Sequence, residues 1–247
     1  MNKTIAATFT IGLLAGVASA EVSITTDFAS AYVFRGTTLN DGFVIQPGIE
    51  ASGLGIPEAY GSVTLGAWGN FDLDDYAPAG AVSSSFQETD WYGSYSLPQF
   101  VEGLDLFVGY TEYTYGAGSN DKEANLGAGY EIGGIALGLT YYQGVGGNIG
   151  TSSYIELALG YSINFSEQFS GSVDARMGYI DIDGGENGFN DYDIGASLGY
   201  ALTDAWSAVI SLAYIGQGDD QVLTDSTASS AGYDVDLVGM FSLSCEL

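Results

Sequence analysis

Apolar and polar residues alternate along most of this chain with a period of two. In residues 154–165, every odd-numbered residue is apolar and most even-numbered residues are small or polar. The apolar positions are Ile155, Leu157, Leu159, Tyr161, Ile163 and Phe165. A period of two places successive side chains on opposite faces of a β-strand, so this segment has one apolar face and one polar face. The same pattern recurs from end to end and predicts an all-β protein.

The alternating stretches predict about twelve strands, most of them near the length that crosses a bilayer at a tilt. The expected strands are residues 22–35, 42–53, 59–72, 87–97, 103–115, 122–132, 135–143, 153–165, 169–182, 190–202, 206–216 and 231–243. Backbone groups inside a bilayer must all be paired, so the sheet must close. We therefore expect a transmembrane antiparallel up-and-down β-barrel, with both termini on the periplasmic side.

The connections between these strands alternate in length. The tight set is 53–58, 98–103, 133–134, 166–168 and 203–205. The other set is mostly longer and richer in Gly, Ser and Asp: 73–86, 116–121, 144–152, 183–189 and 217–230, with 37–41 as its one short member. Short periplasmic turns and longer outer loops are typical of outer-membrane barrels.

The two ends of the chain predict export and membrane insertion. Residues 1–20 combine Lys3, an apolar stretch and the small residues Ala18-Ser19-Ala20, which is the pattern of a signal peptide. We expect residues 21–247 to form the barrel in the outer membrane of a Gram-negative bacterium, surrounded by its lipid. The apolar parity of the last strand resembles the signal read by the barrel-assembly machinery, which we expect as a partner during insertion. A terminal Phe is more typical there than Leu247, and Phe241 is the alternative.

Charge and composition narrow the function. The chain has 31 Asp and Glu against 4 Lys and Arg, a formal net charge of −27, which argues against nucleic acid as a partner and favours cations. A surface adapted to a salty habitat explains the charge equally well. Histidine is absent and Cys245 is the single cysteine, so the usual general base, most zinc sites and an internal disulfide are excluded. We expect no enzyme activity, no cofactor and no resident metal.

Acidic residues at 181–186 and 190–193 offer oxygen ligands of the kind calcium prefers. Their spacing does not match an EF-hand loop, so a solvated loop is the favoured interpretation.

Residues opposite the apolar parity are expected to point into the barrel. The candidate pore-lining or constriction residues are Arg35, Gln46, Glu50, Trp68, Glu156, Asp174, Arg176, Asp234 and Asp236. Arg35 is placed to meet Glu50 across the first hairpin, and Arg176 shares a strand face with Asp174. These arginines either fill a closed lumen with ion pairs or form a constriction that selects ions.

Residues 31–38 (Ala-Tyr-Val-Phe-Arg-Gly-Thr-Thr), Ile45-Gln46 and residues 66–70 (Gly-Ala-Trp-Gly-Asn) resemble the TorF family. That family consists of porin-like proteobacterial outer-membrane barrels and was formerly of unknown function. Residues 88–93 and 108–113 are also similar. The resemblance implies an outer-membrane barrel with a pore and no assigned solute. It implies lumen-facing positions for Arg35, Gln46 and Trp68.

Three functions remain. The first is passive diffusion of small hydrophilic solutes or ions, with a preference for cations. The second is a closed structural or surface-interaction barrel with acidic, ion-binding loops. The third, a membrane hydrolase, is disfavoured because a Ser paired with an acid alone has no competent base at neutral pH. The oligomeric state is left open, since no strand flank is marked as an interface.

Overall fold

The computed structural model describes residues 21–54, 56–73, 85–116, 118–226 and 232–247. The expected signal peptide, residues 1–20, lies outside this range. Within it, the single helical element is the short 3-10 turn Glu58–Tyr60, and no helix is long and apolar enough to cross a membrane.

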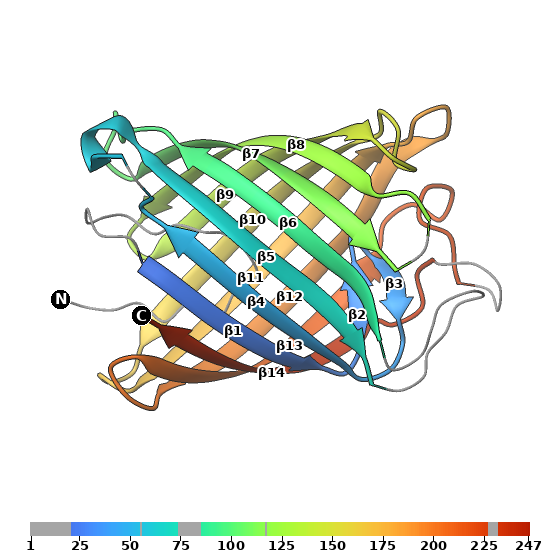
Figure 1. Ribbon diagram of the computed structural model, residues 1–247. Coiled ribbons are helices and arrows are strands. Elements are labelled where there is room, and N and C mark those ends of the chain that lie inside the picture. The colour runs from blue at the N-terminus through green and yellow to red at the C-terminus, as the bar shows by residue number, and fades with distance from the viewer. Residues whose placement is uncertain (1–20, 55, 74–84, 117, 227–231) are drawn as a thin grey trace.

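Twelve antiparallel strands close into a barrel, which confirms the expected fold class (Figure 1). Each strand pairs with its neighbour along the chain, and β14 returns to pair with β1. The strands are β1 (Glu21–Ala29), β4 (Val44–Ser52), β5 (Ser62–Asp72), β6 (Phe86–Ser96), β7 (Leu104–Tyr115), β8 (Asp121–Ile132), β9 (Ile135–Gly146), β10 (Ser153–Asn164), β11 (Phe169–Asp181), β12 (Asn187–Ala201), β13 (Trp206–Gln217) and β14 (Leu237–Glu246).

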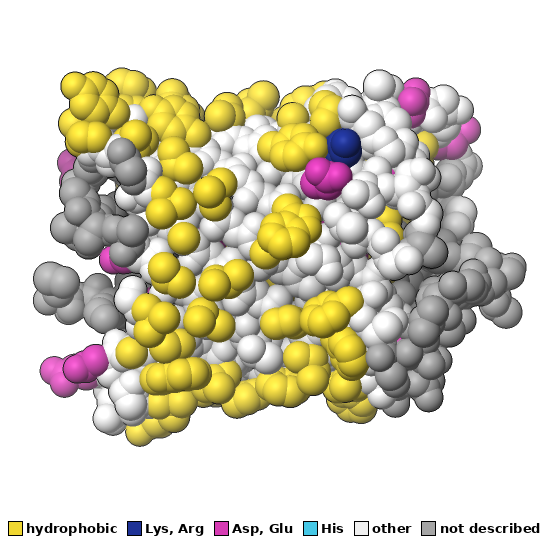
Figure 2. Space-filling view, viewed as in Figure 1, with side chains coloured by type: hydrophobic (Ala, Val, Ile, Leu, Met, Phe, Trp, Pro, Cys, Tyr) yellow, Lys and Arg dark blue, Asp and Glu magenta, His cyan; other side chains and the backbone are white. Residues whose placement is uncertain are grey.

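The outer face of the barrel is apolar and the inner face is polar. Ile194 on β12 is 58% exposed, whereas its neighbour Asp193 is 2% exposed on the opposite face. Apolar side chains are spread over the outer wall, where charged ones are scarce (Figure 2). A surface this apolar is stable only against lipid, because water would leave the exposed side chains unburied.

Both ends of the barrel-forming chain lie at the same end of the barrel (Figure 1). The backbone N–H of Leu247 donates to the carbonyl of Val22 at 2.9 Å. The short connections lie at this end and the longer ones at the other, as the alternation of lengths predicts. We refer to these as the terminal end and the loop end. That the terminal end faces the periplasm stays a prediction.

The expected first strand, 22–35, is wrong in its second half. β1 ends at Ala29, and β2 (Tyr32–Phe34) and β3 (Thr37–Asn40) form a separate hairpin within the connection to β4. Arg35 and Gly36 turn the chain back with φ of 49° and 75°. Two consecutive residues with positive φ form the tight turn that suits a two-residue hairpin. The expected short loop 37–41 is therefore strand β3 and its end.

The expected last strand, 231–243, is shifted, since β14 spans Leu237–Glu246. Residues 232–235 keep the alternating pattern but contact other loop-end segments, whereas the carbonyl of Asp236 still accepts from the Ile215 N–H of β13 at 2.8 Å. Gly232 bridges to Thr38 of the hairpin, and Tyr233 bridges to Asp225. Alternation shows that a segment is extended, but it does not show which segment supplies the backbone partner.

Candidate functional site in the barrel lumen

The β2–β3 hairpin folds into the barrel near the loop end (Figure 1). Tyr32 contacts Trp68 on β5 with ring centroids 5.4 Å apart, and Phe34 contacts Tyr113 on β7 at 5.9 Å. Both partners are on the inward parity of their strands. The hairpin therefore narrows the lumen at this level.

Arg35 at the hairpin tip is held by the opposite wall. Its guanidinium donates to both carboxylate oxygens of Glu123 on β8, at 2.7 and 2.9 Å, and Glu123 also accepts from the Tyr113 hydroxyl at 2.8 Å. The guanidinium lies 4.6 Å from the ring centre of Tyr142 and 4.3 Å from that of Tyr154. Burial alone lowers the pKa of Arg35, but the Glu123 carboxylate outweighs it and holds the pKa above its ordinary value. The Arg35 side chain at the hairpin tip therefore stays positively charged.

The backbone at the hairpin tip is strained. Arg35 has φ of 49° without being a glycine, a conformation that costs an L-residue roughly 1–2 kcal/mol. Its carbonyl accepts a hydrogen bond from Asn190 Nδ2 at 2.8 Å. The two-pronged ion pair and this bond offset the strain, so the tip conformation depends on contacts made by distant strands.

A second cluster surrounds Arg176 on β11. Its Nε donates to Asp193 at 2.6 Å and its Nη1 to Glu156 at 3.1 Å. Asp191 lies 3.6 Å from Nη2 and accepts from the Tyr154 hydroxyl at 2.7 Å. Because Tyr154 also lies against the guanidinium of the hairpin tip, both lumenal arginines belong to one connected network.

The predicted residues of β4 and β5 lie on the inner face. Gln46 donates to Asn70 at 3.0 Å. Trp68 packs against the hairpin, and Glu50 accepts from the Tyr92 hydroxyl at 3.0 Å. The expected meeting of Arg35 with Glu50 is wrong, because the fold-back of the hairpin carries Arg35 away from β4.

The remaining predicted residues lie in two different places. Asp174 lies on the inner face of β11 beside Gly195, while the Arg176 side chain is engaged with Asp193 and Glu156. Asp234 and Asp236 are exposed, in the segment just before β14.

The sequence pattern missed Asp191 and Asp193 as partners of an arginine. It placed them in a candidate calcium loop, yet both are on the inner face of β12. Asp183 of the same stretch instead accepts from the backbone N–H of Thr151 at 3.2 Å. In the described ranges, no three or more acidic or cysteine side chains are grouped to hold a metal ion. The alternation along β12 could have predicted this orientation, because Asp191 and Asp193 are on the face opposite the exposed Ile194.

Charge is distributed unevenly around the lumen. Both lumenal arginines lie against β8–β12. The strands β1, β4, β5 and β6 carry acids and no Lys or Arg. Their inward acids are Asp27, Glu50, Asp72, Glu88 and Asp90. One side of the lumen is therefore strongly negative.

The lumen near the terminal end is lined by small side chains. Gly138 and Gly160 are paired with Ala158 and Ala136 across β9 and β10. A Cβ added at Gly160 would meet no atom within 4 Å, so the inner surface is open there. The hairpin level is thus more crowded than the terminal half.

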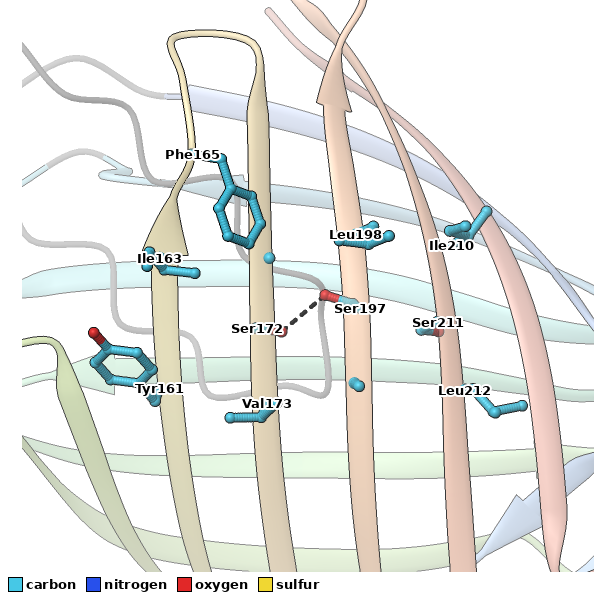
Figure 3. Close-up of a pocket in the computed structure, with 12 residues that line it drawn as sticks. Tyr161, Ile163, Phe165, Ser172, Val173, Ser197, Leu198, Ile210, Ser211 and Leu212 are labelled. Atoms are coloured by element: carbon cyan, nitrogen blue, oxygen red, sulfur yellow. Dashed lines mark hydrogen bonds between the residues drawn. The ribbon is translucent and has the colours of Figure 1, made fainter.

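An apolar groove lies on the lipid side of the barrel, across β10–β13 (Figure 3). Ser172 and Ser197 hydrogen-bond between neighbouring strands at 2.8 Å beneath it. Its apolar lining includes Tyr161, Ile163, Phe165, Val173, Leu198, Ile210 and Leu212. These side chains are exposed on the outer face, so the groove is separate from the lumenal site.

The family model described as "Bacterial protein of unknown function (Gcw_chp)" matches residues 15–243. The chain belongs to the Gcw_chp family. No curated protein matches it. The Gcw_chp description assigns no activity. A function for this chain must therefore be inferred from the geometry of the lumen.

Solved outer-membrane channels share the fold of this Gcw_chp protein. The COG4313 outer membrane channel from Pseudomonas putida F1 is 8% identical, with a TM-score of 0.58 over 98% of this chain and 100% of that one. The KdgM porin is 10% identical, with a TM-score of 0.55 over 90% and 98%. The NanC porin is 7% identical, with a TM-score of 0.55 over 92% and 100%. These similarities establish the architecture.

Proposed function

We propose that this protein is an outer-membrane channel for passive diffusion of small hydrophilic solutes or ions, with a preference for cations. The observation that carries the proposal is the constriction made by the β2–β3 hairpin in a lumen with a large excess of carboxylates. A twelve-stranded barrel lies between small barrels filled by side chains and porins with an aqueous channel. The resemblance to the TorF family and the shared fold with solved porins support a pore.

The lumenal charges favour cations. The two arginines are outnumbered by the four carboxylates of their own network, Glu123, Glu156, Asp191 and Asp193. The acids of β1 and β4–β6 add negative charge with no cation beside them in those strands. Charge of one sign in a narrow, low-dielectric passage concentrates counter-ions there and repels co-ions.

We assign the constriction to Arg35 at the hairpin tip and to Trp68, which packs against Tyr32 of the same hairpin, with Gln46 and Glu50 on the adjoining wall. Glu156, Asp174 and Arg176 line the facing strands. We place Asp234 and Asp236 at the loop-end mouth, because both are exposed there.

A solved KdgM porin is in complex with disordered oligogalacturonate, and is 9% identical with a TM-score of 0.53. A polymer of acidic sugars requires cations along its path. Here both described lumenal cations are already paired with carboxylates. We therefore propose neutral solutes or cations for this channel.

The test is single-channel recording of refolded residues 21–247 in a planar bilayer under a salt gradient. We expect stable steps and a reversal potential of the sign for cations. Glu50→Gln removes a lumenal charge and is expected to lower the cation-to-anion permeability ratio. Glu112→Gln, on the outer face beside Lys122, is the control and is expected to leave the ratio unchanged. Anion selectivity would contradict the proposal.

The second candidate is a closed barrel whose acidic loops bind ions or a partner at the cell surface. The network that ties the hairpin to β8, β10, β11 and β12 favours it, because it occupies part of the lumen. Absence of conductance steps from protein shown to be folded by its heat-modifiable gel shift would select this candidate.

A further inference from the structure

Glu88 and Asp90 form a pair of buried acids on the inner face of β6. They are two residues apart on one strand and therefore point the same way. Their exposed fractions are 6% and 9%. The Glu88 carboxylate interacts with the Asp90 carboxylate and with the hydroxyl of Tyr32 from the hairpin. The pair thus lies where the hairpin meets the wall.

No described cation neutralises this pair. Arg35 is bound to Glu123 and Arg176 to Asp193, while Lys122 lies beside Glu112 on the outer face. Asp121 on β8 adds a further negative charge within electrostatic range of Glu88. The local charge is therefore strongly negative.

Asp90 Oδ1 supplies an independent observation. It is buried and has no hydrogen-bond partner among the described residues. Leaving a buried carboxylate oxygen unpartnered is costly, because it loses its hydration without replacement. An unpartnered oxygen in a cluster of acids is the arrangement expected where a ligand completes the coordination.

Two adjacent buried carboxylates can be stabilised in two ways. They share one proton, or a cation lies between or beside them. A shared proton satisfies the contact between the two carboxyl groups but leaves Asp90 Oδ1 unpaired. A hard cation accepts several oxygen ligands at once and uses that oxygen too. The unpartnered oxygen therefore favours the cation.

We propose that Glu88 and Asp90 form a binding site for a hard divalent cation such as Ca²⁺, at the contact between the hairpin and β6. Two carboxylates balance its charge, and lumenal water fills the remaining positions. With only two protein carboxylates, the expected Kd is on the order of 10⁻⁴–10⁻³ M, as in weak extracellular calcium sites. Since Tyr32 contacts Glu88, occupancy stabilises the docked hairpin.

Isothermal titration of refolded residues 21–247 in detergent with CaCl₂ tests the site. We expect one Ca²⁺ per chain in the unmodified protein, and at least a roughly tenfold weaker affinity in Glu88→Gln and Asp90→Asn, which is about 1.4 kcal/mol. Both substitutions keep the side-chain shape and remove repulsion, so folding is retained and is checked by the heat-modifiable shift. Glu131→Gln, an acid at the terminal end of β8, is the control and is expected to bind as the unmodified protein does.

Three results overturn the proposal. The first is no Ca²⁺ binding by the folded, unmodified protein. The second is equal binding by all the variants, which would assign Ca²⁺ to the acidic loops. The third is equal loss in the Glu131→Gln control. The calorimetric measurement does not depend on conduction. A barrel that binds Ca²⁺ but does not conduct would support this site and contradict the proposed channel function.

Discussion

Single side chains in the lumen are held by charge pairing across strands. Arg176 is the clearest example, because three carboxylates from β10 and β12 surround it. Removing one member of a buried ion pair leaves uncompensated charges, which costs far more than the pair contributes.

Arg176→Gln is expected to lower the free energy of unfolding by about 3–5 kcal/mol. Asp191 and Asp193, at 0% and 2% exposure, would repel each other without a cation. Urea unfolding in lipid vesicles measures the change. Lys122→Gln is the matched control: its pair with Glu112 is exposed and 3.9 Å long, so we expect about 0–1 kcal/mol. Equal losses in the two variants would refute the network.

Gly36→Ala is expected to release the hairpin tip. An added Cβ would lie 2.5 Å from Leu223 Cδ2 and 2.8 Å from Asp191 Cβ, and the backbone has φ of +75°. Overpacking of this kind costs about 1–3 kcal/mol. Trypsin provides the measurement, because Arg35 is one of only three cleavable residues in the described chain, and we expect faster cleavage after it.

Gly133→Ala is the control for this cleavage test. Gly133 also has a positive φ, of +60°, but a Cβ there would meet nothing within 4 Å, and the residue lies in a turn at the terminal end. Trypsin should cleave the Gly133→Ala variant after Arg35 at the same rate as the unmodified protein. If the Gly36→Ala variant is also cleaved after Arg35 at the rate of the unmodified protein, packing does not hold the hairpin tip in place.

The hairpin is the one pair of described strands that is not part of the barrel wall. β1 and β4 already pair from Glu21↔Ser52 to Ala29↔Val44, so the wall closes without it. Its position instead depends on contacts with the opposite side of the lumen. The wall and the hairpin are therefore separable elements.

Replacing residues 31–41 with a short Gly-Ser linker is expected to raise single-channel conductance several-fold, because it removes the hairpin that we propose as the constriction. The barrel should still fold and show its heat-modifiable gel shift. Replacing residues 182–186, which join β11 to β12, is the control and should leave conductance nearly unchanged. A conductance equal to that of the unmodified protein would place the constriction elsewhere.

The whole molecule separates lipid outside from polar space inside. This contrast is sharpest between neighbouring residues of one strand. Leu159 on β10 is 47% exposed on the outer face, while Gly160 faces open space in the lumen.

Leu159→Arg is expected to destabilise the barrel by roughly 2–4 kcal/mol, because it places a cation near the middle of the bilayer. Gly160→Arg adds the same side chain one residue away, facing the acidic lumen, and is expected to cost far less. Unfolding in vesicles of defined lipid measures both free energies. If the two costs are equal, the assignment of inner and outer faces is wrong.

The pattern of apolar and polar residues is sufficient to predict the barrel. Alternation with a period of two is a local property, so it shows where strands run and which side chains share a face without knowledge of distant residues. The alternation of loop lengths then gave the up-and-down order. The strand edges differ from the expected ones where extended segments pair outside the wall, at residues 30–40 and 232–235.

The side chains that meet inside the barrel could not be predicted from the sequence, because their contacts depend on the closed fold. Arg35 and Glu123 are 88 residues apart in sequence, and no local pattern links them. Parity placed Gln46, Glu50 and Trp68 on the inner face but gave no partner across the lumen. The fold-back of the hairpin depends on contacts with β5, β7, β8 and β12 that exist only once the barrel has closed.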